Sequence, residues 1–556
     1  MNKVVKKTLC SIGAFLILIV ALPLMYGIYL YNKADFKCPN IEVNLDSYPM
    51  TVNKDSLRMI GNDYLMLNKY GLWEAYVSGT PIDRGAKLGI MEKDLLHYQE
   101  SVFVKQIRQI IPSDKYLSFL HKLVAVFNWD MATYIPEEYR QEIYGISQSC
   151  SHEFDLFGTP YERQLNYHAA HDIGHTMQEY MLVGCSSFAV WNEASGDSAL
   201  LVGRNFDFYV GDDFAKNKIV LFVSPKKGYK YASVTWPGMI GVLSGMNEQG
   251  LTVTINAAKG KIPTSSAMPI SILVRTILQY ADDIDTAYKI AKSNKTFVSE
   301  SILVGSKKDG YAAIIEKSPE KIAIYKTPAN RLLCTNHYQS DAFSNDESNL
   351  ENIKLSDSQY RYNRLEELVS QSLPITPEKA ATILRDYKGL KNKDIGLTNQ
   401  KSINQAIAHH SVIFKPTELK MWVSTGPWQA GPYICYDLNR IFGNTHLGKS
   451  MIDTNRTIIA DTLFLAKLYP QIKRYREQYK ILKKSILDKS PLSPEFINGF
   501  LKTNPQYYET YNIVGDYMLM KGDKVSAKQY WRLSLQKEIP TVSEKNNIEK
   551  KIEKHD

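Results

Sequence analysis

The sequence predicts an α+β protein in which two β-sheets pack between helical layers, a four-layer αββα sandwich. Three observations predict it. Short β-rich runs begin directly after residue 184, at 187–191, 199–206, 219–223, 231–236, 240–244 and 251–256. Helical patterns follow at 269–280 and 284–293, and β-rich runs resume at 301–304, 312–316, 321–325 and 332–335. Further helical patterns cover 358–370 and 377–386, and the last β-rich runs lie at 411–414, 420–424 and 433–437. Strand blocks that alternate with helix blocks bury both faces of two sheets.

The 556-residue chain is too long for one core, and its pattern divides it into four parts. We predict a membrane anchor over 1–32, a tether and helical precursor segment over 33–184, the sandwich over 185–455 and a helical region over 456–556. The last part has the spacing of one tetratricopeptide-like hairpin, at Val514, Gly515, Met518, Gly522, Ala527, Trp531, Leu535 and Pro540. One hairpin cannot form a solenoid, so we expect it to pack on the main domain and to offer a surface for a protein partner.

The N-terminal segment has the pattern of a membrane-spanning helix. The run from Thr8 to Tyr31 contains no charge and follows Lys3, Lys6 and Lys7. Its length suits a spanning helix, which needs about 20 residues. The segment after it lacks the small-residue cleavage site of a signal peptide. We therefore expect a single-pass anchor that holds the body of the protein outside the cytoplasm, in the periplasm or the extracellular space. A cleaved signal is the alternative and would place the body on the same side.

Charge and metal-ligand patterns exclude several classes of function. The net charge of +9 is mild for this length, and no nucleic-acid-binding motif accompanies it. The six cysteines form no CxxC pair, which argues against zinc-finger and thioredoxin-like sites. His168, His171 and His175 would share one helix face, a spacing that metal sites use, but we expect them to pack the precursor segment and expect no metal. We expect the pair His409 and His410 at a strand edge rather than in catalysis.

The β-rich block opens with a candidate nucleophile. Cys185 follows Gly184 in the segment Gly-Cys-Ser-Ser-Phe at 184–188, and Gly-Arg-Asn-Phe-Asp follows at 203–207. In a strand, Arg204 faces one side and Asp207 the other. Arginine and aspartate inside a β-rich core are costly unless they are paired or used. Both residues are therefore candidates for a site near Cys185.

Further segments follow these two in a fixed order. They are Gly-Met-Asn-Glu-Gln-Gly-Leu at 245–251, Thr-Asn-His-Tyr at 335–338 and Ser-Gln-Tyr-Arg-Tyr-Asn-Arg-Leu at 358–365, with Gly-Thr-Pro-Ile-Asp-Arg-Gly at 79–85 upstream. The ordered set resembles the linear-amide hydrolase branch of the N-terminal nucleophile superfamily. That branch includes choloylglycine hydrolases and acid-ceramidase-like amidases, and the acyl-CoA:6-aminopenicillanic acid acyltransferases look closest. The resemblance covers roughly 60–440.

The resemblance implies self-cleavage between Gly184 and Cys185. In such families the thiol attacks the preceding carbonyl, an N-to-S acyl shift gives a thioester, and hydrolysis frees the cysteine as a new N-terminus. Glycine before the cysteine offers little steric hindrance. The freed α-amine has an ordinary pKa of about 7.7–8.0, so it can act as the general base for its own thiol.

The resemblance also assigns roles to other residues. Asp207 would hold the new α-amine, and Arg204 would stabilise the sulfur anion. Asn256 and Asn336 would orient the substrate and stabilise the oxyanion, and Arg361 would bind substrate. No cofactor is implied.

These patterns together predict a membrane-anchored, self-processing cysteine amidohydrolase that acts on a small-molecule N-acyl amide. Acyl transfer from a thioester donor such as coenzyme A is the alternative within the same chemistry. The location outside the cytoplasm, away from free coenzyme A, ranks hydrolysis first. An inactive, membrane-tethered interaction protein that uses its C-terminal helices is the alternative from another class.

Overall fold

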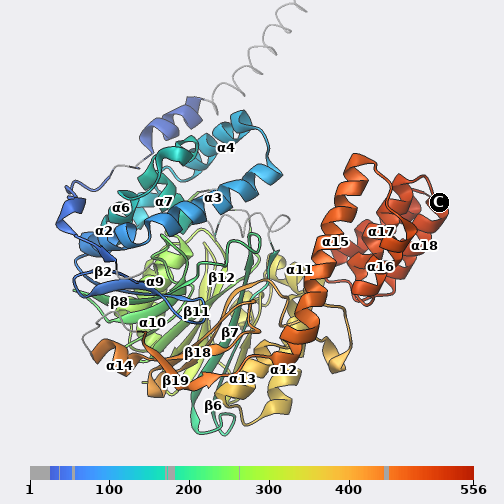
Figure 1. Ribbon diagram of the computed structural model, residues 1–556. Coiled ribbons are helices and arrows are strands. Elements are labelled where there is room, and N and C mark those ends of the chain that lie inside the picture. The colour runs from blue at the N-terminus through green and yellow to red at the C-terminus, as the bar shows by residue number, and fades with distance from the viewer. Residues whose placement is uncertain are drawn as a thin grey trace, which may run out of the picture.

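The computed structural model describes residues 25–34, 36, 38–52, 57–169, 172, 182–261, 263, 265–443 and 450–555. Within these ranges the strands form an 11-stranded sheet and an 8-stranded sheet (Figure 1). The first has the order β1 (Thr51–Val52), β2 (Leu57–Ile60), β3 (Asp63–Leu67), β4 (Trp73–Gly79), β8 (Ile219–Pro225), β9 (Tyr231–Thr235), β10 (Ser244–Asn247), β11 (Leu251–Ala257), β12 (Glu300–Ser306), β13 (Tyr311–Lys317), β14 (Ile322–Tyr325). The second has the order β15 (Arg331–Cys334), β6 (Ser186–Asn192), β7 (Ser198–Tyr209), β16 (Ala408–Lys415), β17 (Lys420–Ser424), β18 (Tyr433–Asp437), β19 (Ile452–Ile458), with β5 (Leu182–Val183) on β7.

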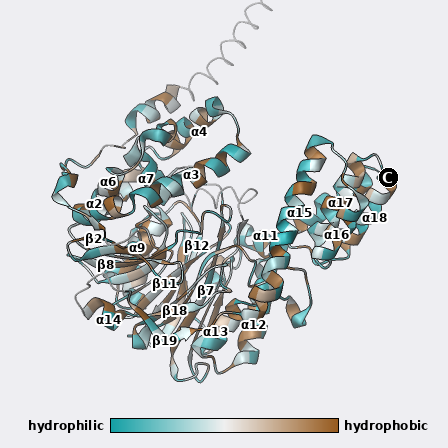
Figure 2. Cartoon of the chain, in the orientation of Figure 1, coloured by the Kyte–Doolittle hydropathy of each residue, from teal (hydrophilic) through white to brown (hydrophobic). Residues whose placement is uncertain are grey.

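The two sheets pack face to face between helices, as the sequence predicts for this part of the chain. Apolar side chains from both fill the space between them, among them Val202 and Val412 from the second sheet and Val220 and Phe222 from the first. Figure 2 shows apolar residues along these strands. Helices α9 (Ile270–Tyr280) and α10 (Ile284–Ser293) contact the first sheet, and α12 (Ser358–Ser372) and α13 (Pro377–Leu384) contact the second. The shorter helices α11 (Glu347–Leu355) and α14 (Leu438–Gly443) lie at the periphery.

The segment before the candidate cleavage site contributes β1–β4 to the first sheet and β5 to the second, and none of these five strands was predicted from the sequence. A tether and a helical precursor segment were expected over 33–184, whereas β1–β5 occupy part of this range. Gly61 and Gly71, both with positive φ, lie in the turns that separate these short strands. β4 runs parallel to β8, with Trp73 opposite Ile219 and Gly79 opposite Pro225. The first sheet therefore combines strands that precede residue 184 (β1–β4) with strands that follow it (β8–β14).

Helices from this upstream segment cover the first sheet. They are α2 (Pro81–Met91), α3 (Lys93–Ile110), α4 (Asp114–Phe127), α5 (Met131–Tyr134), α6 (Glu137–Ser147) and α7 (Pro160–His168). A buried ionic triad joins them to the sandwich. Glu142 of α6 lies 2.5 Å from Arg84 of α2 and 2.7 Å from Arg275 of α9. Gly85 allows the close approach, since a Cβ there would lie 2.0 Å from the Glu142 carbonyl oxygen.

The C-terminal region is helical and docks on the second sheet's side of the molecule (Figure 1). Its helices are α15 (Tyr469–Asp488), α16 (Pro494–Thr503), α17 (Tyr508–Met520), α18 (Lys524–Leu535) and α19 (Val542–Glu553). Trp531 of α18 is buried against Gly515 of α17, where a Cβ would lie 2.5 Å from the indole. The side chain of Asn504 exchanges two hydrogen bonds with the Leu397 backbone, at 3.0 and 2.9 Å, and thereby ties the region to the main domain.

The predicted N-terminal membrane helix is contradicted by the structure. No helix in the described ranges is long and apolar enough to cross a bilayer. The described part of the uncharged run, residues 25–31, belongs to a short helix over 25–33, and residues 1–24 lie outside the described ranges. The single-pass anchor, and with it the predicted placement of the body outside the cytoplasm, is therefore not supported.

Candidate active site

Cys185 lies directly before β6 and is fully buried. The peptide group before it is held from two sides. The Gly184 N–H donates a hydrogen bond to the Asp207 carbonyl at 3.1 Å. The Gln405 Nε2 donates one to the Gly184 carbonyl at 3.0 Å. A Cβ at position 184 would lie 2.6 Å from that Nε2, so a larger residue here would displace the Gln405 side chain.

Arg204 of β7 brings its guanidinium group to the Cys185 thiol. The Nη2 lies 3.5 Å from the Sγ. The Nη1 donates to the Ser244 Oγ at 2.5 Å and to the Leu243 carbonyl at 3.1 Å, which fixes the group in place. Burial raises the pKa of the Cys185 thiol above its ordinary value, and the positive charge of Arg204 opposes that rise. The arrangement gives a thiolate at Cys185 a fixed counter-charge.

Asp207 faces the opposite side of the same strand. Arg204 contacts strands of the first sheet, whereas Asn205 donates to the Leu384 carbonyl of α13 at 2.8 Å, so alternate residues face opposite layers. Both carboxylate oxygens of Asp207 are buried and have no hydrogen-bond partner among the described residues. Burial raises the pKa of Asp207 to about 8, although Arg361 and Arg204 act to lower it.

Arg361 of α12 binds the backbone of the candidate nucleophile. Its Nη1 donates to the Cys185 carbonyl at 2.7 Å and to the Ser186 Oγ at 3.2 Å. Its Nη2 donates to the Asn336 Oδ1 at 2.8 Å. The Asn336 Nδ2 in turn donates to the Ala257 carbonyl at 2.7 Å. The structure therefore brings Arg361 and Asn336 to Cys185, and in the uncleaved chain Arg361 holds the nucleophile residue itself.

Asn256 of β11 has no hydrogen bond to Cys185 among the described residues, and it contacts Ser187 of β6 instead. Its Nδ2 donates to the Cys334 and Thr335 carbonyls at 3.0 and 3.1 Å, and its Oδ1 accepts from the Ser187 Oγ at 2.8 Å. Both hydrogens of this amide are thus used to join β11 to the end of β15. A role for Asn256 as a donor to substrate stays a prediction.

A chain of hydrogen-bonded polar side chains behind Arg204 was not predicted from the sequence. Both His409 and His410 are fully buried in β16 rather than at an exposed edge. The His410 Nε2 lies 2.9 Å from the Ser244 Oγ, which accepts from Arg204, and the two histidine Nδ1 atoms lie 2.9 Å apart. Burial lowers the pKa of each imidazole well below its ordinary value, so both are neutral. Two adjacent histidines in a strand that continues into the apolar residues 412–414 were the signal that could have identified these hydrogen bonds.

His168, the first of the three upstream histidines, is a structural residue. It is buried, its Nδ1 donates to the Gln164 carbonyl at 2.7 Å, and its Nε2 accepts from the Ile240 N–H at 3.0 Å. Burial lowers its pKa to about 4, so the ring is neutral. His171 and His175 lie outside the described residues. Among the residues that are described, no cluster of three or more His, Cys, Asp or Glu side chains could hold a metal ion.

Comparison with known proteins gives two relatives in sequence. An uncharacterized protein of Archaeoglobus fulgidus is 24% identical over 425 residues, which cover 69% of this chain and 68% of that protein. Protein dcd1B of Dictyostelium discoideum is 23% identical over 219 residues, which cover 37% of this chain and 41% of that protein.

Several solved structures are similar to parts of the chain. An N-acylethanolamine-hydrolyzing acid amidase ortholog of Caenorhabditis elegans is 16% identical, with a TM-score of 0.30, and covers 42% of this chain and 93% of its own. A conjugated bile acid hydrolase variant of Clostridium perfringens is 12% identical, with a TM-score of 0.32, and covers 50% of this chain and 98% of its own. A penicillin V acylase of Agrobacterium tumefaciens is 13% identical, with a TM-score of 0.30, and covers 46% of this chain and 87% of its own.

A family model matches the central part of the chain. The match, to acyl-coenzyme A:6-aminopenicillanic acid acyl-transferase, runs over residues 191–428. It starts after Cys185 and includes β7, with Arg204 and Asp207, and the Asn336 and Arg361 segments. Residues 191–428 of this chain are therefore similar to the acyl-coenzyme A:6-aminopenicillanic acid acyl-transferase family, which is the resemblance that the sequence motifs indicate.

Proposed function

We propose that the chain is a self-processing cysteine amidohydrolase, which cleaves itself before Cys185 and then hydrolyses a linear N-acyl amide. Amide hydrolysis and acyl transfer both fit the matched family. The observation that carries the proposal is the Asp207 carboxylate, which is buried without a hydrogen-bond partner on the strand that binds Gly184. An unpaired buried carboxylate is costly. Cleavage before Cys185 would supply the missing cation, the new α-ammonium group.

The proposed self-cleavage uses groups that already surround the peptide bond. The Cys185 Sγ attacks the Gly184 carbonyl carbon, and the thiol proton passes to the Cys185 nitrogen as the C–N bond breaks. Water then attacks the resulting thioester and releases the Gly184 carboxylate and the Cys185 thiol. The Gln405 Nε2 hydrogen bond to the Gly184 oxygen supports this step, because it would stabilise the negative charge that develops there.

The mature enzyme would repeat this chemistry on a substrate. The Cys185 α-amine takes the thiol proton, the thiolate attacks the acyl carbonyl, and the leaving amine departs with the proton. Water then hydrolyses the acyl thioester. Arg204 lies against the sulfur, and we assign Asp207 to the α-ammonium group and Arg361 to holding the Cys185 backbone. Asn336 uses one Nδ2 hydrogen on Ala257, and we assign the other to the substrate oxyanion.

The acceptor of the acyl group is decided by a direct experiment. Purified, cleaved protein is incubated with N-acyl amides of different chain length, with and without added amine acceptors, and free acid and transferred product are measured by mass spectrometry. We expect free acid as the main product and an acyl group on the fragment that begins at Cys185. Dominant transfer to the amine would favour the acyltransferase. Cleaved protein that forms neither product nor acyl-enzyme would contradict both and favour an interaction protein.

The two fragments produced by cleavage are expected to stay together under native conditions. The upstream fragment supplies β4 to the first sheet and two members of the buried Arg84–Glu142–Arg275 triad. Breaking a buried ion pair costs about 3–5 kcal/mol, in addition to the lost strand pairing. Gel filtration should give one species that contains both fragments, and denaturing electrophoresis should separate them. Loss of the upstream fragment on the native column would show that it is a removable pro-segment.

Arg204→Lys is expected to lower turnover by about 10²-fold in protein that has been cleaved. A single ammonium group cannot contact the Cys185 Sγ, the Ser244 Oγ and the Leu243 carbonyl together, as the guanidinium group does. The rate of Cys185 alkylation as a function of pH should show a raised thiol pKa. Arg385→Lys is the matched control, because Arg385 also donates to carbonyls, at Gln429 and Gly431, but does not contact Cys185. Equal losses in both variants would mean that Arg204 acts only in packing.

A further inference from the structure

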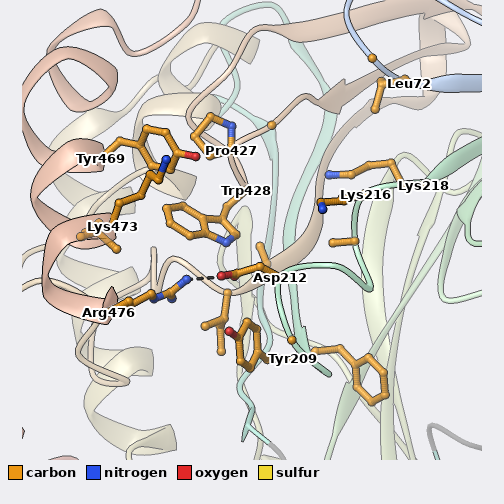
Figure 3. A pocket seen from close by; sticks show the side chains of 18 of the residues that line it. Leu72, Tyr209, Asp212, Lys216, Lys218, Pro427, Trp428, Tyr469, Lys473 and Arg476 are labelled. Atoms are coloured by element: carbon orange, nitrogen blue, oxygen red, sulfur yellow. Dashed lines mark hydrogen bonds and ion pairs between the residues drawn. The ribbon is translucent and has the colours of Figure 1, made fainter. Parts of the chain in front are cut away.

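A cavity of ≈ 520 Å³ opens between the ends of β7 and β16 and the C-terminal helix α15 (Figure 3). Its walls are partly apolar and aromatic, with Tyr209, Trp428, Tyr469 and Ile472 among the lining residues. Helix α15 lies beyond the matched range 191–428. The C-terminal helical region thus builds one wall of a cavity whose other walls belong to the catalytic domain.

The charges that line this cavity are mostly positive. Five basic side chains line it against two acidic ones, Asp212 and Glu477. The basic residues are Lys216, Lys218, Lys473, Arg476 and Lys480. Asp212 is already engaged, because its Oδ1 lies 3.0 Å from the Arg476 Nη1 (Figure 3). The cavity therefore has an excess of positive charge that its own acids do not neutralise.

Lys218 is the most unusual of these residues. The residue is only 4% exposed, and in Figure 3 its side chain extends into the cavity beside Lys216. Lys216 is paired with Asp213 at 2.5 Å, whereas the described part of the chain offers the Lys218 ammonium group no hydrogen bond or ion pair. Burial lowers the pKa of Lys218 to about 8, and no neighbouring acid opposes that effect. An unpaired buried ammonium group destabilises a fold, so such a group is expected where a bound anionic ligand supplies the missing counter-charge.

We propose that this cavity binds an anionic group of the substrate, with Lys218 as its buried counter-charge. The inference rests on the proposed amidohydrolase function and narrows its substrate class to N-acyl amides that carry an acidic group. Carboxylate and phosphate groups share the chemistry that Lys218 recognises. The aromatic walls would contact the apolar part of the same molecule.

The cavity adjoins the candidate active site, because two strands, β7 and β16, contribute residues to both. On β7, Tyr209 lines the cavity two residues after Asp207. On β16, Ala408 lines it and is the strand partner of Asp207. Residue 182, just before the cleavage site, pairs with Tyr209. An anion held by Lys218 therefore lies at the end of β7 to which the cleavage segment is attached.

Binding is tested first, in protein that cannot turn over. Uncleaved Cys185→Ala protein is titrated calorimetrically with an N-acylglycine, with the uncharged N-acylglycinamide of the same chain length, and with inorganic phosphate. We expect the carboxylate to bind at least ~10-fold more tightly than its amide, which is the effect of one charge-assisted contact. Tighter binding of phosphate than of the carboxylate would identify a phosphate-bearing substrate as the source of the anion. Equal binding of the charged and uncharged ligands would overturn the proposal.

Lys218→Met tests the counter-charge itself. The variant should remove the preference for the carboxylate, whereas Lys292→Met, which neutralises an exposed lysine on α10, should retain it. Lys218→Met should also raise the Tm of the ligand-free protein, because methionine has a similar shape to lysine but does not bury an unpaired charge. A lower Tm together with an unchanged preference would show that Lys218 is a structural residue and would overturn the proposal.

Turnover by cleaved wild-type protein separates this inference from the proposed function. If the chain cleaves the N-acylglycine with a kcat/KM at least ~10-fold above that for the N-acylglycinamide, both stand. If it binds the anion but cleaves neither compound, the amidohydrolase function fails while the anion site stands. If the uncleaved variant binds the anion and cleaved protein does not, the cavity holds the chain's own new Gly184 carboxylate, and the substrate site is overturned.

Discussion

Replacing Cys185 with alanine is expected to leave the chain in one piece and to abolish amide cleavage. The substitution removes the thiol that Arg204 contacts, and with it the atom that we expect to attack both Gly184 and the substrate. In the proposed mechanism the thiol and the α-amine base belong to the same residue and act together. Loss of such a nucleophile lowers turnover by several orders of magnitude, here at least ~10⁴-fold. Mass spectrometry of the purified protein and an amide-hydrolysis assay measure the two effects separately.

Two further variants make this experiment specific. Cys185→Ser keeps a weaker nucleophile, so slow cleavage with little turnover is expected. Cys435→Ala removes a buried thiol of β18 and should be cleaved like the wild type. A wild-type preparation that hydrolyses amides while remaining one uncut chain would refute processing before Cys185.

The part of the site that could be predicted lies on neighbouring strands of one sheet. Cys185, Arg204 and Asp207 are joined by the pairing of β5 and β6 with β7, a connection over about one hairpin. Strand alternation places Arg204 and Asp207 on opposite faces without knowledge of the rest of the fold. Local periodicity was therefore sufficient to place Arg204 and Asp207 correctly relative to each other.

The remaining contacts depend on residues that are far apart in the sequence. Gln405 reaches the Gly184 carbonyl over 221 positions, and His410 reaches Ser244 over 166. No periodicity links such residues, because their meeting depends on how two sheets and several helices close around one another. The same limit explains β4, whose parallel partner β8 lies on the other side of the candidate cleavage site. Parallel pairing needs a long crossover and leaves no short-range turn signal.

Asp207→Asn is expected to have opposite effects before and after cleavage. In the uncleaved chain, burial raises the pKa of Asp207 from its ordinary 3.8 to about 8. The folded state therefore binds the proton more tightly than the unfolded state. Ionisation of Asp207 destabilises the fold increasingly as the pH rises from about 4 to about 8. In a Cys185→Ala background, Asp207→Asn should raise the Tm at pH 8 and leave it nearly unchanged at pH 4.

After cleavage the same substitution should be harmful. The new α-ammonium group of Cys185 would then be the partner of Asp207, and asparagine would leave that cation buried without a counter-charge. Removing one partner of a buried ion pair costs about 3–5 kcal/mol. We expect turnover, normalised to the amount of cleaved chain, to fall by about 10²-fold or more, with a shift of the low-pH limb of the rate profile. Thermal unfolding at pH 4 and pH 8 measures the stabilising effect in the uncleaved chain, and the pH–rate profile measures the harmful effect after cleavage. If Asp207→Asn changes the Tm in the same direction in uncleaved and cleaved protein, and turnover stays near that of the wild type, Asp207 does not bind the α-amine.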